Sequence, residues 1–296
     1  MRTTALTLLT AAASVIALAA PASAAHGALV VTGLTANDRL VTFPASDPGT
    51  IRSTVKITGV DGDVEAIDFR PATGELYALA STGAGAQLFE VDPASGVATR
   101  VGTATYPITG NLSIDFNPTV DRLRVVSDDG TNLRVNPDTG ALAATDGRLA
   151  YQAGDPAAGL QPGIGDVAYT NNDADCTTAP ACPATATGTM LFDVDAALDQ
   201  LAQQVDANGG VLRTVGPLGQ RTKAQATGFD VYTRTSTGTN WAFVSLFDKG
   251  RTTFYEIDLA TGQPITVTAP VPGSGKVIAT RPHVTDIALA PAQAGF

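Results

Sequence analysis

Short runs of alternating apolar and polar residues cover most of this chain, and turn residues separate them. Between residues 66 and 102 four such runs follow one another, at 66–71, 74–79, 87–93 and 95–102. In a β-strand the side chains change face at every residue, so this alternation predicts half-buried strands. The stretch therefore predicts four short strands joined by turns.

The same four-run unit recurs along the sequence. A second copy runs from 113 to 142, and looser copies begin at Gly165 and Gly228. Asp-Pro or Asn-Pro followed by Ser-Gly or Thr-Gly predicts a tight turn between the third and fourth runs, because Pro presets φ and Gly accepts positive φ. In the third copy, the position of residues 196–204 within the unit favours a turn and a strand over a short helix.

The two ends of the chain carry complementary fragments of the unit. Residues 29–59 match its later runs, and residues 285–291 match only its first. A C-terminal strand that completes the N-terminal sheet closes a ring and removes the sheet edges that an open array exposes. Four whole units and one shared unit predict an all-β fold, a five-bladed β-propeller of four-stranded blades. We expect it to form a single domain over residues 25–296.

The first 24 residues have the pattern of a secretory signal peptide. Arg2 is followed by an uncharged apolar run, and Ala22 and Ala24 fit the small-residue cleavage pattern. The apolar run is too short and too rich in Ala for a comfortable membrane span, and no later segment reaches the length of one. We therefore expect cleavage after Ala24 and a secreted or periplasmic protein.

Two cysteines lie close together, Cys176 and Cys182. In an exported protein they predict a disulfide that pins one loop, near residues 171–188. Two thiols without a nearby histidine do not complete a tetrahedral metal site.

The charge balance narrows the range of partners. The net charge of −10 argues against nucleic acid and anionic membrane surfaces, both of which select Lys and Arg clusters. A saccharide, another small molecule or a protein remain as partners, and we expect a monomer.

Several motifs resemble one known family. Asp-Phe-Asn-Pro-Thr-Val-Asp-Arg-Leu-Arg-Val-Val-Ser at 115–127 is the most specific, and the segments at 37–43, 67–79, 132–137 and 168–172 extend the likeness. In these residues the chain resembles the bacterial family called domain of unknown function 4394, over about residues 29–290. The resemblance implies a secreted, propeller-like domain and brings no activity with it. The loop at 173–188 departs from the family pattern in its length.

One aspartate recurs in the first run of every unit: Asp68, Asp115, Asp166, Asp230 and Asp286. If the first strand is innermost, five carboxylates surround the channel, where a cation such as Ca²⁺ or a polar ligand would offset their repulsion. The other interpretation is structural, because Asp readily accepts hydrogen bonds from backbone N–H groups of a neighbouring strand or turn. Both interpretations stay open from the sequence.

Other charged and aromatic residues have further candidate roles. Asp61, Asp63, Glu65 and the pair Asp128-Asp129 are further cation-ligand candidates without the spacing of a calcium loop. Arg70 is placed to pair with Asp68 on one side of its strand, and Arg122 to pair with Asp121 in a turn. Four strand aromatics are expected to pack between blades, namely Tyr77, Trp241, Phe243 and Phe254.

Catalytic groups are scarce. The only histidines are His26, beside the cleavage site, and His283, and no nucleophile elbow accompanies them. The leading hypothesis is a non-enzymatic extracytoplasmic binding or scaffold propeller, with Ca²⁺ as the cofactor to test. The alternative is a calcium-assisted lactonase-like or glycan-cleaving hydrolase built on the channel carboxylates. A third hypothesis is an adhesin that binds through its loops.

Overall fold

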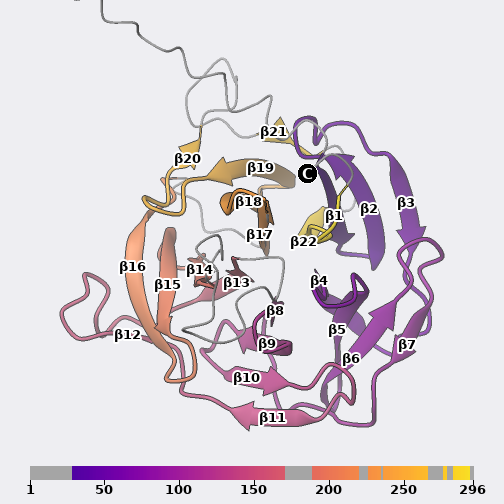
Figure 1. Ribbon diagram of the computed structural model, residues 1–296, viewed down its shortest axis with the longest axis horizontal. Helices are drawn as coiled ribbons and strands as arrows, with labels where there is room; N and C mark the ends of the chain where they lie inside the picture. Colours follow the sequence, from indigo (N-terminus) through magenta and orange to yellow (C-terminus); the bar gives the residue numbers. More distant parts are fainter. Residues whose placement is uncertain are drawn as a thin grey trace, which may run out of the picture.

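The described residues of the computed structural model form a ring of five sheets around a central axis (Figure 1). They comprise residues 29–170, 189–219, 226–234, 236–265, 276–278 and 283–293. The predicted five-bladed β-propeller is confirmed. None of the described segments is a helix of the length and apolarity that a bilayer crossing requires. The signal-peptide prediction and the Cys176–Cys182 disulfide prediction fall on residues outside the described ranges.

Each blade is an antiparallel sheet whose strands follow one another from the axis outward. Blade 1 contains β22 (Val284–Ala288), β1 (Val30–Thr35), β2 (Arg39–Pro44) and β3 (Ser53–Lys56). Blade 2 contains β4 (Asp63–Phe69), β5 (Leu76–Thr82), β6 (Gly85–Val91) and β7 (Ala98–Arg100). Blade 3 contains β8 (Leu112–Asn117), β9 (Arg122–Ser127), β10 (Asn132–Val135) and β11 (Leu142–Thr145).

The remaining two blades carry short additions. Blade 4 contains β13 (Ile164–Tyr169), β14 (Leu191–Asp195), β15 (Gln200–Asp206) and β16 (Val211–Pro217), with β12 (Ala150–Tyr151) pairing in parallel with β16. Blade 5 contains β17 (Ala226–Arg234), β18 (Thr239–Asp248), β19 (Arg251–Ile257) and β20 (Pro264–Ile265), with β21 (Lys276–Val277) also on β19. The strand β15 confirms that residues 196–204 form a turn and a strand rather than a helix.

The ring is closed by the C-terminal strand. β22 pairs antiparallel with β1, with Gly33 opposite Ile287 and Leu34 opposite Asp286. The complementary fragments at the two ends of the sequence therefore build one sheet, as their pattern predicted. Closure leaves the innermost strand of every blade facing the axis, and the innermost strands of adjacent blades are in contact.

Aromatic side chains fill the spaces between blades. Tyr77 of blade 2 meets Phe116 of blade 3 edge to face, with ring centroids 5.1 Å apart. Phe254 of blade 5 meets Phe43 of blade 1 in the same way at 5.5 Å. Such pairs contribute about 0.5–1.5 kcal/mol beyond the area they bury. The predicted packing of strand aromatics between blades is confirmed at these two interfaces.

Close packing at the axis explains one glycine. A Cβ atom on Gly228 would lie 2.7 Å from the backbone nitrogen of Ile287 and 2.8 Å from the Cα of Asp286. These are backbone atoms of the neighbouring inner strand, so they cannot turn aside as a side chain could. Gly228 therefore sets how closely β17 approaches β22.

We predict that Gly228→Ala destabilises the protein by about 1–3 kcal/mol, because the added methyl group forces two inner strands apart. The matched control is Gly83→Ala, since a Cβ there meets no atom within 4 Å. Chemical denaturation of both variants measures the difference. Equal stability of the two variants would contradict the close approach of β17 and β22.

Candidate functional site: the aspartate belt and the axial cavity

The structure brings all five predicted aspartates to the axis. Each lies on the innermost strand of its blade, and none is more than 7% exposed. We call this set the aspartate belt; its members are Asp68, Asp115, Asp166, Asp230 and Asp286. The prediction that the first run of each unit forms the innermost strand is correct.

Every belt aspartate links its own blade to the next one. The bonds between blades are Ile67 N to Asp286 Oδ2 (2.7 Å), Phe116 N to Asp68 Oδ2 (2.9 Å), Tyr169 N to Asp115 Oδ2 (2.8 Å), Phe229 N to Asp166 Oδ2 (2.5 Å) and Leu289 N to Asp230 Oδ2 (2.5 Å). These bonds cross each of the five blade interfaces once. The belt is therefore a closed circle of side chain to backbone contacts.

The second carboxyl oxygen is used within the blade at four positions. Oδ1 of Asp68, for example, accepts from the N–H of Phe69 at 2.7 Å. Asp166, Asp230 and Asp286 accept in the same way from the residue that follows them. A typical intramolecular hydrogen bond contributes about 0.5–1.5 kcal/mol. The structural interpretation of the recurring aspartate thus has a direct geometric basis.

The belt has two tiers along the axis. Asp166 and Asp286 accept a hydrogen bond from the N–H of the residue just before the aspartate of the next blade. The other three accept from a residue that follows the aspartate of the next blade. The charge of Asp286 raises the pKa of Asp166, and the charge of Asp68 raises that of Asp115, so these carboxyl groups interact electrostatically. The first pair lines a cavity at one end of the channel.

Burial raises the pKa of every belt carboxyl. The pKa of Asp230 rises to about 7 and that of Asp286 to about 6, in both cases chiefly because the charged form is desolvated. The pKa of Asp166 rises well above its usual value through burial and then through the neighbouring charge of Asp286. Backbone N–H bonds act in the opposite direction but are weaker. The belt therefore holds protons at pH values where an ordinary Asp is ionised.

The donor geometry gives calcium little support. Within the described ranges, no three or more His, Cys, Asp or Glu side chains are grouped so that they could hold a metal ion. The belt oxygens point to backbone N–H groups of adjacent blades instead. A Ca²⁺ ion requires about six to eight oxygen ligands around one point. Calcium binding stays a prediction to be tested.

A cavity of about 380 Å³ opens at the end of the channel where the inner strands begin. All five blades contribute to it, and its ionisable lining groups are Glu65, Asp128, Asp166, His283 and Asp286. His283 stacks on Phe247 with ring centroids 3.5 Å apart, and burial lowers its pKa. Burial therefore favours the neutral imidazole, and every other ionisable group among the described residues that line the cavity is a carboxyl group.

Only some of the other predicted cation ligands line the axial cavity. Glu65 and Asp128 reach the cavity, where Glu65 accepts a hydrogen bond from Ser81 and Asp128 accepts one from the Asn111 amide at 2.8 Å. Asp129 instead accepts hydrogen bonds from Ser127 and Thr131 in its own turn, and these bonds lower its pKa to about 2. Asp61 and Asp63 are exposed.

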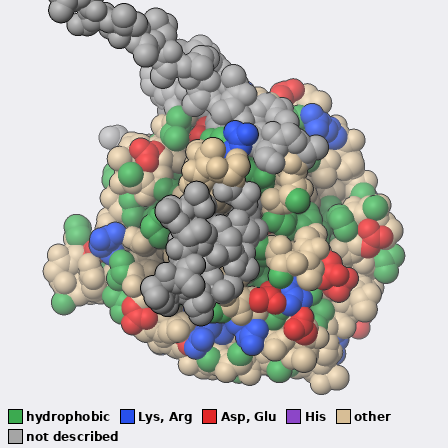
Figure 2. Space-filling model, in the orientation of Figure 1, with side chains coloured by type: hydrophobic (Ala, Val, Ile, Leu, Met, Phe, Trp, Pro, Cys, Tyr) green, Lys and Arg blue, Asp and Glu red, His purple; other side chains and the backbone are tan. Residues whose placement is uncertain are grey.

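Both predicted arginine pairings are wrong. Arg70 does not partner Asp68 but reaches across the blade interface to Asp121 and to Asp138, whose carboxylate lies 2.7 Å from Nη1. Arg122 donates to the backbone carbonyl of Asp121 rather than to its carboxylate. The Asp68 carboxyl is occupied by backbone N–H groups, so Arg70 is free to extend outward. On the face in Figure 2, acidic and basic side chains of the described residues lie next to one another at the lower rim.

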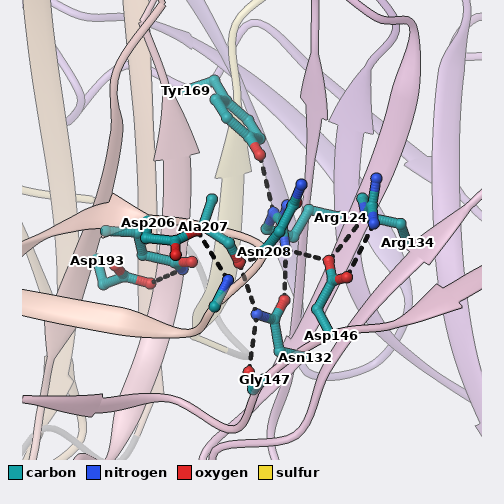
Figure 3. A network of polar contacts seen from close by, with 12 residues as sticks. Arg124, Asn132, Arg134, Asp146, Gly147, Tyr169, Asp193, Asp206, Ala207 and Asn208 are labelled. Atoms are coloured by element: carbon teal, nitrogen blue, oxygen red, sulfur yellow. Dashed lines mark hydrogen bonds and ion pairs between the residues drawn. The ribbon is translucent and has the colours of Figure 1, made fainter.

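A second polar centre was missed by sequence reasoning. Buried Arg124 donates to the Tyr169 hydroxyl at 2.8 Å and to the Asn208 side chain at 3.0 Å, both in blade 4, and pairs with Asp146 at 3.1 Å (Figure 3). Asp146 also accepts two bonds from Arg134. The sequence signal was weak, because an arginine between Leu123 and Val125 takes the polar position of the alternation, where exposure is expected. The partners of Arg124 lie far from it in the sequence, so the sequence alone could not identify them.

We predict that the melting temperature falls as the pH rises from about 5 to about 8. The folded state keeps protons on Asp230 and Asp286 up to pH values of about 7 and 6, whereas an unfolded Asp releases its proton near 3.8. Folding therefore takes up protons in this window, and the stability that this provides is lost as the folded pKa values are passed. Calorimetry over the pH series measures the fall.

Asp230→Asn is the variant for this effect, since it removes one titrating group while keeping the size of the side chain. Its melting temperature at acidic pH should lie below that of the wild type, because the amide cannot accept on both sides, and its pH dependence should be flatter. A wild-type melting temperature that rises between about pH 5 and about 8 would contradict protonation of the belt.

Comparison with known proteins is informative about family and fold. The chain is similar to a structural genomics protein of unknown function from Bacteroides thetaiotaomicron VPI-5482, at 16% identity and a TM-score of 0.50 over 90% of this chain and 68% of that one. It is also similar to an auxiliary nutrient binding protein from Bacteroides ovatus ATCC 8483, at 14% identity and a TM-score of 0.41 over 71% of this chain. A third similar structure is TolB from Acinetobacter baumannii, at 14% identity and a TM-score of 0.40 over 88% of this chain and 57% of that one.

The likeness to the Bacteroides thetaiotaomicron protein bears on the fold alone. The chain spans 55% of the length of the nutrient binding protein. No curated protein sequence matches significantly. The sequence profile described as "Domain of unknown function (DUF4394)" matches residues 39–280. Because that match covers most of the chain, the protein belongs to the DUF4394 family.

Proposed function

We propose that this protein is a non-enzymatic, extracytoplasmic binding protein that takes a small organic cation into the axial cavity. The observation that carries the proposal is the cavity itself: all five blades meet there, and four carboxyl groups line it. Its volume of about 380 Å³ falls within the range of small-molecule sites, about 300–1,000 Å³. Export rests on the signal-peptide pattern of the first 24 residues.

The electrostatics favour a positively charged guest. Glu65, Asp166 and Asp286 all have raised pKa values, chiefly through burial, and neighbouring carboxylates raise those of Glu65 and Asp166 further. A cation would relieve both effects, because it offsets the repulsion and supplies a partner for the charged form. Neither Lys nor Arg is among the described residues that line the cavity.

An organic cation suits the cavity better than a metal ion. Glu65 and Asp128 approach it from different blades and each already has a hydrogen-bond partner. They can face a large, diffuse charge such as an ammonium group without converging on one point. A metal ion would need the convergent oxygen ligands that the described residues do not offer.

The hydrolase alternative gains no support from the geometry. Glycosidases place two carboxyl groups about 5–9.5 Å apart on either side of the bond they cleave. Asp166 and Asp286 each accept hydrogen bonds from backbone N–H groups of two blades, so the fold itself engages both oxygens of each carboxyl group. His283 lies against Phe247 and has no nucleophile paired with it among the described contacts.

We predict that putrescine and choline bind to the full chain, with affinity that increases from about pH 5 to about 7.5. The sign follows from Asp286, whose pKa of about 6 means that it loses its proton in this range and becomes attractive to a cation; burial also raises the pKa of Glu65. Isothermal titration calorimetry at low salt measures the affinity. Glu65→Gln combined with Asp128→Asn should weaken binding at least about tenfold.

The matched control is Glu75→Gln, which removes one exposed carboxylate away from the cavity and should leave binding unchanged. Calcium chloride is the second probe. Stoichiometric calcium binding without amine binding would replace the organic cation with a metal ion, and absence of binding by all three probes would overturn the proposal.

A further inference from the structure

A groove between blades 3 and 4 has unmet hydrogen-bonding capacity. It has a volume of about 550 Å³ and shares no lining residue with the axial cavity. One wall comes from Asn117, Thr119 and Arg124 of blade 3, and the other from blade 4, including Tyr169 and Gln204. Figure 3 shows the polar network that underlies it.

Two buried oxygen atoms have no partner within the described part of the chain, one on Gln204, which lines the groove, and one on Asp193, to which Gln204 donates. Gln204, 5% exposed, lines the groove and donates through Nε2 to Asp193 Oδ1 at 2.7 Å. Among the described residues, neither the Oε1 atom of Gln204 nor the Oδ2 atom of Asp193 has a hydrogen-bond partner. Buried polar atoms in native proteins are nearly always satisfied, so an unmet pair beside a groove points to an absent ligand.

Arg124 adds a donor to the same groove. Its Nε and Nη1 atoms are engaged by Tyr169, Asn132 and Asp146, whereas Nη2, which carries two hydrogens, donates only to Asn208 among the described residues. Arg124 shares the carboxylate of Asp146 with Arg134. The residues that line the groove thus offer an acceptor, Gln204 Oε1, and a donor, Arg124 Nη2.

We infer that this groove is a second binding site and that its ligand is a saccharide. A hydroxyl group both donates and accepts, so neighbouring sugar hydroxyls can satisfy Gln204 Oε1 and Arg124 Nη2 together. A carboxylate ligand has no hydrogen to donate to the Gln204 oxygen. An ammonium ligand would be repelled by the positive charges of Arg124 and Arg213. A polyhydroxylated neutral molecule is the chemical class that satisfies both groups.

The groove continues past one ring. Met190, Gln203 and Arg213 line both this groove and an adjoining cavity of about 720 Å³. The adjoining wall is more apolar and includes Phe192 and Ile257. Sugars present apolar C–H faces as well as hydroxyl edges, so a glycan of more than one residue fits a groove that passes from a polar to an apolar wall.

Met190 provides a reporter at the junction, because the chain contains only one other methionine, Met1. The full chain is labelled with [¹³C-methyl]methionine, and the Met190 signal is assigned with Met190→Leu. Glucose, galactose, N-acetylglucosamine and the disaccharides maltose, cellobiose and chitobiose are titrated at millimolar concentration. We expect at least one sugar to shift the Met190 signal saturably, whereas sodium acetate and putrescine leave it in place.

A double variant tests the orphaned pair. Asp193→Leu with Gln204→Leu should weaken sugar binding at least tenfold while leaving the melting temperature unchanged or raised, because two apolar groups replace an incompletely bonded pair. Ser245→Ala is the control, since it also removes a buried oxygen without a partner, but Ser245 does not line the groove. This variant should leave sugar binding unchanged. The Glu65→Gln/Asp128→Asn variant should also bind sugar normally, which separates this site from the axial cavity.

Failure of every sugar to shift the Met190 signal overturns the inference, as does binding that survives in the Asp193→Leu/Gln204→Leu variant. A shift produced by a mixed peptide library but by none of the sugars would reassign the groove to a protein partner and likewise overturn it. The Met190 readout uses the wild-type chain, so the decision stands even if the double variant does not fold.

Discussion

The ring depends on a hydrogen-bonding problem at its axis. The innermost strand of each blade pairs with the next strand on only one side, so its other edge presents backbone N–H groups to the channel. Buried N–H groups must find acceptors. The belt aspartates supply them, and because each carboxylate reaches the next blade, the same contact that satisfies the backbone also joins neighbouring sheets. One aspartate in each unit therefore satisfies the backbone N–H groups at the strand edge and also joins its blade to the next one.

This arrangement ties ring closure to protonation. The closing strand β22 carries Asp286, which accepts a hydrogen bond from the N–H of Ile67 in blade 2, and the N–H of Leu289, just after β22, donates to Asp230 of blade 5. The C-terminal strand is thus held on both sides by belt contacts as well as by its pairing with β1. Burial raises the pKa values of all five carboxyls, and the charge of Asp286 raises that of Asp166 further, so the folded ring favours their protonated forms.

The fold and the belt could be predicted because both depend on local pattern. Alternation and turn residues determine the strands, and the recurrence of Asp in the first run marks the axis. The Arg70–Asp121 and Arg124–Asp146 pairs could not be predicted, since an arginine selects among acidic residues that come close only after the ring has formed. Gln204 and Asp193 fall into the same class. Nothing in the sequence of residues 191–204 shows that a side-chain oxygen will be buried without a hydrogen-bond partner. Whether it has a partner depends on which residues come together when the blades assemble.

The belt can be both a structural contact and the floor of a binding cavity. A carboxylate offers about four lone-pair sites on its two oxygens. Asp286 gives one on each oxygen to backbone N–H groups, at 2.7 Å in both cases, and so retains capacity on the side that faces the cavity. Its remaining charge can act on a guest through space while its position stays fixed by two strands. A rigidly held, partly neutralised carboxylate loses little freedom when a ligand arrives, which makes the axis of the ring suited to binding.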